Sequence, residues 1–356
     1  MNTTQIKGLL ISAKNELNNM LSLKRTKKIK YEDQQYFDLI TQCSLWNVAG
    51  EETSNIMNEI DDVPSGDSLM QQLQKFKLAE VEDQFNLIYE KQFDKQIKKR
   101  NRKAIVIIDL HEQETHSKDR RISDDIRGGK HKNGTNFFFK FATVQVIVKN
   151  KIITLGVRLY RRQDTIEKIV HKLIRRVKMF VKIKVLLLDR GFRNVKIFNN
   201  LEYLGVPVLM PCIKDEKTRK QLEKAASKMQ VVKAYWRNGE GEYADFKLLI
   251  IRLGTDKEIA FCTTIKFPRF HRAKYFLNLY AKRWNIETGY RLQNLFLPKT
   301  TCVKGVVRYF YFCYAVAMHN LWLILRSTIG KRMFTVTKMK FILVYFWITT
   351  HLSLDL

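Results

Sequence analysis

The chain has 356 residues, of which 45% are hydrophobic and only five are proline, so it can bury a large core. This composition excludes a disordered or collagen-like protein, and the length predicts about two domains. Lysine and arginine outnumber the acidic residues by 64 to 35, for a formal net charge of +29. Such an excess predicts attraction to a polyanion, either nucleic acid or an anionic membrane surface.

The five cysteines are far apart and show neither a CxxC pair nor the histidine spacing of a zinc site. An odd count without a disulfide-rich pattern favours a reducing compartment. The N-terminus lacks a basic segment followed by a sustained apolar stretch, so no signal peptide is predicted. We therefore expect a cytoplasmic protein.

The N-terminal part of the chain, residues 1–103, is predicted to be helical. Apolar residues recur at helical spacing within 69–88, and Ser65 is a candidate N-cap. Two basic runs, 22–30 and 95–103, lie in this part. In a chain of such charge they favour a DNA-binding role for the N-terminal region.

The pattern then changes to strands. A β-branched run at 104–110 suits a strand buried on both faces and carries Asp109 near its end. Two further strand-like runs, joined at 149–151, predict an antiparallel hairpin. A basic helix then precedes a second apolar strand, 185–188, which is followed directly by Asp189.

The order strand, hairpin, helix, strand, helix, strand is typical of an RNase H-like mixed sheet, in which the first and fourth strands are neighbours. Asp109 and Asp189 would then meet at adjacent strand ends. The expected fold class is α/β, with a β-rich insertion before the last carboxylate. The expected parts are a helical N-terminal region, a catalytic core in two segments, an insertion and a C-terminal tail, at residues 1–103, 104–213 with 268–330, 214–267 and 331–356.

A helix predicted over 275–296 follows the insertion and carries Glu287. Two aspartates at strand ends and a glutamate on a later helix supply hard oxygen ligands for Mg²⁺ or Mn²⁺. Two such ions, roughly 3.5–4 Å apart, can activate an attacking oxygen and stabilise a leaving one in phosphoryl transfer. On a continuous helix at about 100° per residue, five residues share one face: Tyr280, Arg283, Glu287, Arg291 and Asn294.

The segments IIDL with Asp109, LLLDRGF with Asp189 and YAKRWNIETGYRLQN with Glu287 resemble the DDE transposases of insertion-sequence group four. That group carries a Y-x2-R-x3-E-x6-K signature, which Tyr280, Arg283 and Glu287 match in type and spacing. The resemblance spans residues 104 to about 325.

The last position of the signature differs. Asn294 stands where the family has lysine, and Lys299 is the nearest substitute. The role of that lysine in holding the DNA end is therefore not assigned to a matching residue in this chain.

The resemblance implies cut-and-paste DNA transposition. Metal-activated water would cleave one strand at the element end, and the freed 3′-OH would attack target DNA. Asp109, Asp189 and Glu287 would hold two Mg²⁺ or Mn²⁺ ions. The implied partners are double-stranded DNA at the element ends and target DNA, bound by a homodimer that is associated with the nucleoid in a prokaryote.

Six side chains are predicted to contact DNA: Tyr280, Arg283, Arg190, Arg291, Lys299 and Trp236. Some family members pass through a DNA hairpin, which needs a flipped base stacked on an aromatic ring. Trp236 or Trp284 would serve this purpose, although a tryptophan in a strand or beside a helix face is more often a packing residue. His111 and His116 lack a third partner at ligand spacing and are interpreted as loop residues.

Three alternatives stay open. An RNase H-like DNA endonuclease would cut without joining, and a catalytically inactive, element-derived protein would only bind DNA. A membrane protein is the third, because residues 306–325 are apolar enough to suggest a span. Arg308, His319 and Asn320 within this stretch are costly at bilayer depth, which favours a helix buried in a protein core.

Overall fold

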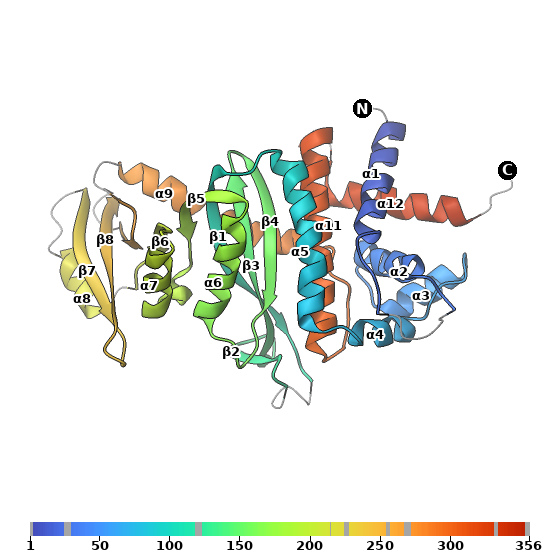
Figure 1. Cartoon of the computed structure of the whole chain (residues 1–356), viewed down its shortest axis with the longest axis horizontal. Helices are drawn as coiled ribbons and strands as arrows, with labels where there is room; N and C mark the ends of the chain where they lie inside the picture. The colour runs from blue at the N-terminus through green and yellow to red at the C-terminus, as the bar shows by residue number, and fades with distance from the viewer. Residues whose placement is uncertain are drawn as a thin grey trace.

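The computed structural model describes residues 3–24, 30–117, 123–213, 215–223, 228–253, 257–266, 272–330 and 334–352. The described part of the chain is a mixed α/β fold, in which strands form one mixed sheet and a group of helices lies at one end (Figure 1). The strands are β1 (Arg102–Glu114), β2 (Arg127–Lys132), β3 (Thr135–Val148), β4 (Lys151–Leu159), β5 (Val181–Leu187), β6 (Val208–Pro211), β7 (Met229–Arg237), β8 (Tyr243–Leu253) and β9 (Lys257–Thr263).

The helices on the N-terminal side of the sheet are α1 (Thr3–Asn18), α2 (Asp33–Trp46), α3 (Gly50–Asn58), α4 (Gly66–Gln74) and α5 (Leu78–Ile97). The later helices are α6 (Ile166–Lys178), the short 3₁₀ helix η2 (Arg190–Phe192), α7 (Val195–Tyr203), α8 (Glu216–Glu223), α9 (Ala273–Ala281), α10 (Trp284–Asn294), α11 (Gly305–Ile329) and α12 (Val336–His351).

Helix α4 begins as predicted, because the Ser65 hydroxyl accepts a hydrogen bond from the Ser68 amide at 3.1 Å. The first residue of this helix, Gly66, lies against the backbone of α3. A Cβ atom at Gly66 would collide with the amide nitrogen of Glu51. The two short helices therefore cross at a distance that only glycine permits.

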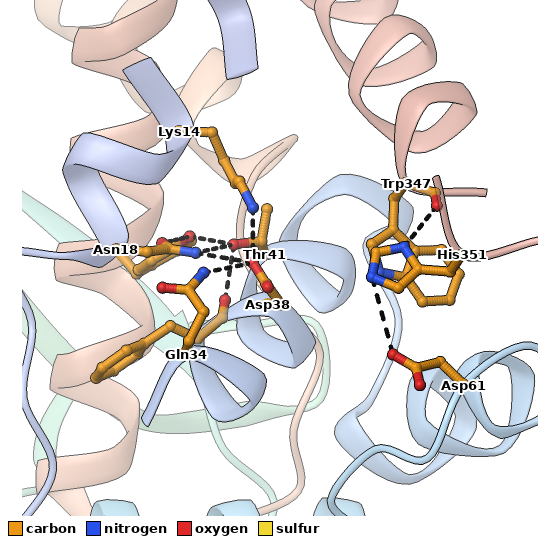
Figure 2. A network of polar contacts seen from close by, with 10 residues as sticks. Lys14, Asn18, Gln34, Asp38, Thr41, Asp61, Trp347 and His351 are labelled. Atoms are coloured by element: carbon orange, nitrogen blue, oxygen red, sulfur yellow. Dashed lines mark hydrogen bonds and ion pairs between the residues drawn. The ribbon is translucent and has the colours of Figure 1, made fainter. Parts of the chain in front are cut away.

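Polar contacts join α1 to α2, as Figure 2 shows. The Asp38 carboxylate accepts from Lys14 Nζ at 2.7 Å, from Asn18 Nδ2 at 3.2 Å and from Gln34 Nε2 at 3.1 Å. One carboxylate thus ties side chains of both helices together, and its charge is compensated by the ammonium group.

The apolar stretch 306–325 forms most of α11, which is buried between α5 and β4. Two of its polar side chains find partners: Asn320 donates to the Thr154 carbonyl at 2.8 Å, and Arg308 donates to the Cys302 carbonyl at 2.7 Å. His319 is buried without a hydrogen-bond partner among the described residues, and its ring stacks on that of Trp322. The prediction of a buried core helix is confirmed. Within the described ranges, we find no helix with the length and apolar character needed to cross a membrane.

The sheet brings together strands that are distant in sequence. β1 pairs with β3 in antiparallel and with β5 in parallel fashion, and β5 pairs in parallel with β6. β3 and β4 form the predicted hairpin. The predicted adjacency of the first and fourth strands is therefore confirmed.

The insertion is built differently from the expected separate unit. Its last strand, β9, pairs in antiparallel fashion with β6, so β9, β8 and β7 continue the same sheet (Figure 1). This pairing satisfies the backbone groups of β6, which would otherwise be an exposed edge. A pairing between strands so far apart leaves no local signal in the sequence.

The C-terminal segment also differs from the expected tail. Within 331–356, the helix α12 packs against α1 and α2, so the first and last helices of the chain lie side by side (Figure 1). The rings of Trp46 and Trp347 meet edge to face at 6.3 Å, and His351 lies 3.8 Å from the Asp61 carboxylate (Figure 2). Helix α12 buries the apolar side chains of Val336, Met339, Leu343 and Trp347, which explains why this segment packs on the fold.

Candidate active site

Asp109 and Asp189 occupy equivalent positions on two neighbouring parallel strands. The pairing of β1 with β5 sets Ile107 opposite Leu187, and each aspartate follows two residues later. Asp109 lies within β1, whereas Asp189 comes directly after Leu188 and precedes η2. The fold therefore brings the two carboxylates to the same edge of the sheet, as the sequence predicted.

Glu287 lies on the second of two helices, where the sequence predicted one continuous helix. The predicted helix over 275–296 is broken into α9 and α10, with Lys282 and Arg283 at the junction. The amides of both residues bond three residues back, Lys282 to Leu279 at 3.2 Å and Arg283 to Tyr280 at 2.9 Å. Both residues keep right-handed helical backbone angles, so the break is a local tightening of the hydrogen bonding. Arg283 still contacts the Tyr280 ring at 5.9 Å and pairs with Glu287 one turn further on, so these three residues of the predicted face remain together.

Arg283 connects the carboxylates. Its Nη1 atom lies 3.2 Å from Asp109 Oδ2, and its Nη2 atom lies 2.5 Å from Glu287 Oε1. The Arg283 and Asp109 side chains are only 14% and 16% exposed, so water screens this ion pair weakly. The guanidinium therefore holds the α10 carboxylate beside the β1 carboxylate.

Tyr280 lies on α9, before Arg283, and contacts the segment that leads to Asp189. Its hydroxyl donates to the Leu188 carbonyl at 3.4 Å, directly before Asp189, and its ring packs 5.2 Å from that of Phe261. Burial raises the pKa of Tyr280, so the phenol remains a proton donor at neutral pH. The residue fixes the end of β5 from which Asp189 extends.

Burial also raises the pKa of Asp109 to about 6, against the opposing effect of Arg283. The negative charges of Asp189 and Glu287 add to this rise. Asp109 therefore lies in a mostly buried position close to two further carboxylates.

Two contacts that the sequence did not reveal seat α10 on the sheet. Tyr290 and Thr143 join their hydroxyls at 2.6 Å, and Thr143 is the residue of β3 directly opposite Asp109. Gly289 faces Gln145, whose Nε2 atom would lie 2.6 Å from an added Cβ. The helix therefore approaches β3 closely, one turn from the glutamate. None of these four residues belongs to a recognisable motif, so the sequence offers no signal for these contacts.

The sequence analysis interpreted His111 as a loop residue, but the structure places it within β1. Its ring lies between those of Tyr290 and Phe312, at 4.8 and 5.1 Å. Burial lowers its pKa to about 4, so the ring is neutral at physiological pH. His111 supports the helix beside the site rather than binding an ion.

The remaining basic candidates lie around the carboxylates in different ways. Arg190 is exposed in η2 next to Asp189, and Arg291 is exposed one turn beyond Glu287. Lys299 and Asn294 line a cavity of about 870 Å³ between the N-terminal helices and the end of β1. These positions leave the cationic groups accessible to a bound polyanion.

The two tryptophans differ. Trp236 is 7% exposed and packs against Phe198 and Phe246, on a strand five positions from β1 in the sheet. The structure thus gives Trp236 a packing role apart from the carboxylates. Trp284 is 65% exposed and precedes Glu287 by three residues on α10, which places the two side chains on neighbouring parts of the helix surface.

The three carboxylates suit a divalent ion by their chemistry, since Mg²⁺ and Mn²⁺ prefer oxygen ligands. Nevertheless, in the part of the chain that the structure describes, no three His, Cys, Asp or Glu side chains are grouped closely enough to share an ion. The guanidinium of Arg283 instead lies between Asp109 and Glu287. Asp109, Asp189 and Glu287 are the residues that would hold such an ion.

Searches against protein-family models and against curated proteins find no match to this chain.

Proposed function

We propose that the chain is a DDE transposase with an RNase H-like core, which cleaves and joins DNA strands. The observation that supports this most directly is the placement of Asp109 and Asp189 side by side, where the parallel pairing of β1 with β5 ends, with Glu287 tied to Asp109 through Arg283. The strand order β4, β3, β1, β5, β6, with β3 alone antiparallel to its neighbours in this part, agrees with that core.

The three carboxylates would hold two Mg²⁺ or Mn²⁺ ions, which supply an activated water and stabilise the leaving oxygen when bound. Arg283, when released from Asp109, is positioned to bind a phosphate beside the scissile bond. Arg190 and Arg291 would bind flanking phosphates, and the ring of Trp284 would stack on an exposed base.

DNA at the element ends and target DNA would be the partners, bound by a homodimer so that two active sites process two ends. The cations of the N-terminal region would add sequence-independent contacts to the DNA backbone. The cytoplasm, at the nucleoid of a prokaryote, is the compartment that such a reaction requires.

The test measures strand cleavage and joining on a labelled duplex that carries the DNA flanking the coding sequence, with Mg²⁺ or Mn²⁺. We expect Asp189→Asn to abolish both reactions and Asp83→Asn, at an exposed position of α5, to leave them unchanged. Cleavage without joining would instead indicate an endonuclease. DNA binding without either reaction would indicate an inactive descendant of a mobile element.

A further inference from the structure

The helix α6 has two chemically distinct sides. Its apolar residues, including Ile169, Leu173 and Val177, are buried against the sheet. Its opposite side carries four exposed cations in a row: Lys168, Lys172, Arg175 and Lys178. With a rise of about 1.5 Å per residue, neighbouring members of this row are roughly 4.5–6 Å apart along the helix axis.

This row borders a cavity of about 510 Å³ between α5, α6 and β4. Its wall contains five cationic side chains and one acidic side chain: Arg158, Lys172, Arg175, Arg176, Lys178 and Glu82. Gly156 forms part of the wall, and an added Cβ there would lie only 3.2 Å from Val144. The absence of a side chain at Gly156 lets α6 pack closely on the sheet beside the cavity.

Hydrogen bonds to backbone carbonyls hold Arg176 in place. Arg176 donates to the Leu155 carbonyl at 2.7 Å and to the Asn86 carbonyl at 2.6 Å. Burial lowers the pKa of Arg176, and the nearby charges of Glu90 and Glu82 oppose this effect.

The one acidic side chain in the cavity wall pairs with one of the cations. Glu82 forms an ion pair with Arg158. Lys172 and Arg175 form no ion pair with any residue that the structure describes. The cavity therefore has an excess of positive charge that an anion would compensate.

The cavity lies on the face of the sheet opposite the carboxylates. Thr143, whose register partner is Asp109, bonds to Tyr290 of α10. The next residue of β3, Val144, faces Leu173 of α6 across Gly156. Because successive residues of a strand point to opposite faces, α6 and the candidate active site are on opposite sides of the sheet.

We propose that α6 and this cavity form a second nucleic-acid surface, which binds phosphates of a DNA segment other than the one at the carboxylates. The cavity alone would fit a small phosphate compound. The row of cations continues along the helix past the cavity, however, and this length matches an extended polyanion rather than a single phosphate group. The surface goes beyond the proposed catalytic function and does not need it.

The test is the salt dependence of binding to a labelled random-sequence duplex in EDTA, so that metal-dependent chemistry does not contribute. The variant replaces Lys168, Lys172 and Arg175 with glutamine. The matched control replaces three exposed lysines on other elements: Lys75, Lys233 and Lys338. Each lost phosphate contact lowers the slope of log K against log salt by about 0.9.

We expect the α6 variant to lose about 2 to 3 units of slope and the control to lose less than about 1. Equal losses would show that overall charge, and not this surface, binds DNA, and an unchanged slope in the α6 variant would overturn the proposal outright. Circular dichroism checks that each variant is folded. If the triple variant unfolds, Lys172→Gln and Arg175→Gln are tested singly, each with an expected loss of about 0.9.

A second arm distinguishes nucleic acid from small phosphates. Pyrophosphate is added to the wild-type chain. The thermal unfolding of the protein is then measured in the presence and in the absence of the duplex. Stabilisation by pyrophosphate together with an unchanged DNA slope in the α6 variant would assign the cavity to a small phosphate compound and overturn the nucleic-acid proposal. Strand cleavage is assayed separately, so failure of the catalytic proposal leaves this result intact.

Discussion

At the scale of single residues, the burial of Asp109 predicts a specific pH dependence of stability. Its pKa is about 6 in the folded chain, against about 3.9 for an unfolded aspartate. The folded state therefore binds more protons than the unfolded state between these values, and the free energy of unfolding falls as pH rises through that window.

We expect the metal-free wild-type chain to lose about 1–3 kcal/mol relative to Asp109→Asn between about pH 4 and about pH 6. Urea unfolding in EDTA at several pH values measures this difference. Parallel curves for the two proteins would show that Asp109 is not held at a raised pKa.

Arg283 supports a second prediction at this scale. Arg283→Gln removes the cation between two carboxylates, so those carboxylates repel each other without compensation. We expect a loss of about 1–3 kcal/mol in EDTA and a smaller loss when Mn²⁺ is present, because the ion replaces the missing charge.

Arg291→Gln is the matched control, because that side chain is exposed on the same helix and makes one weak contact, 3.4 Å to the Thr288 hydroxyl. Thermal unfolding of both variants with and without Mn²⁺ is the measurement. A loss in Arg283→Gln no larger than in the control would contradict the proposed bridging role.

At the scale of elements, the docking of α10 on β3 controls where Glu287 lies. Tyr290→Phe removes the hydrogen bond to Thr143 and leaves that hydroxyl buried without its partner. The expected cost is about 0.5–1.5 kcal/mol of stability, with a loss of strand cleavage as α10 shifts on the sheet.

Tyr309→Phe provides the control for this prediction, since the Tyr309 hydroxyl donates to the Val157 carbonyl at 2.7 Å, away from the carboxylates. It should cost similar stability without changing cleavage. Equal cleavage rates in the two variants would mean that the Tyr290 contact has no part in placing Glu287.

The sequence predicted the elements whose signals are local. The β-branched run ending near Asp109, the hairpin turn at 149–151 and the cap at Ser65 were all visible in short windows. The break at Arg283 was not, because the helical spacing continues through it without glycine or proline. The change to i−3 hydrogen bonds at this point therefore has no counterpart in the apolar spacing.

At the scale of the whole molecule, the N-terminal helices and the sheet share one core. The Tyr89 hydroxyl donates to the Cys313 carbonyl at 2.9 Å, and Gln92 donates to the Ala317 carbonyl at 2.9 Å. Phe85 also packs against Phe310, with ring centroids 5.1 Å apart. The boundary expected at residue 103 is therefore crossed by a large apolar contact.

We accordingly expect a fragment that begins at residue 98 to be insoluble or unfolded, since it exposes the buried side of α11 to water. Circular dichroism and size-exclusion chromatography compare it with the whole chain. A folded, monodisperse fragment would show that the N-terminal helices are a separable unit.

These long-range contacts are also what the sequence could not predict. Net charge indicated a polyanion as partner, and the strand order indicated neighbouring aspartates, because both follow from composition or simple topology. The pairing of β6 with β9 and the packing of α12 on α1 join segments with no common pattern. Only the packing of the complete core selects them.

The central position of α11 has a consequence for biosynthesis. On the ribosome, α5 is finished at residue 97, but its main partner helix is complete only at residue 329. At about 5–20 residues per second, the interval is roughly 10–50 s. During that time the apolar side of the nascent N-terminal helices has no α11 to cover it, so the growing chain is a substrate for chaperones well before the carboxylates can assemble.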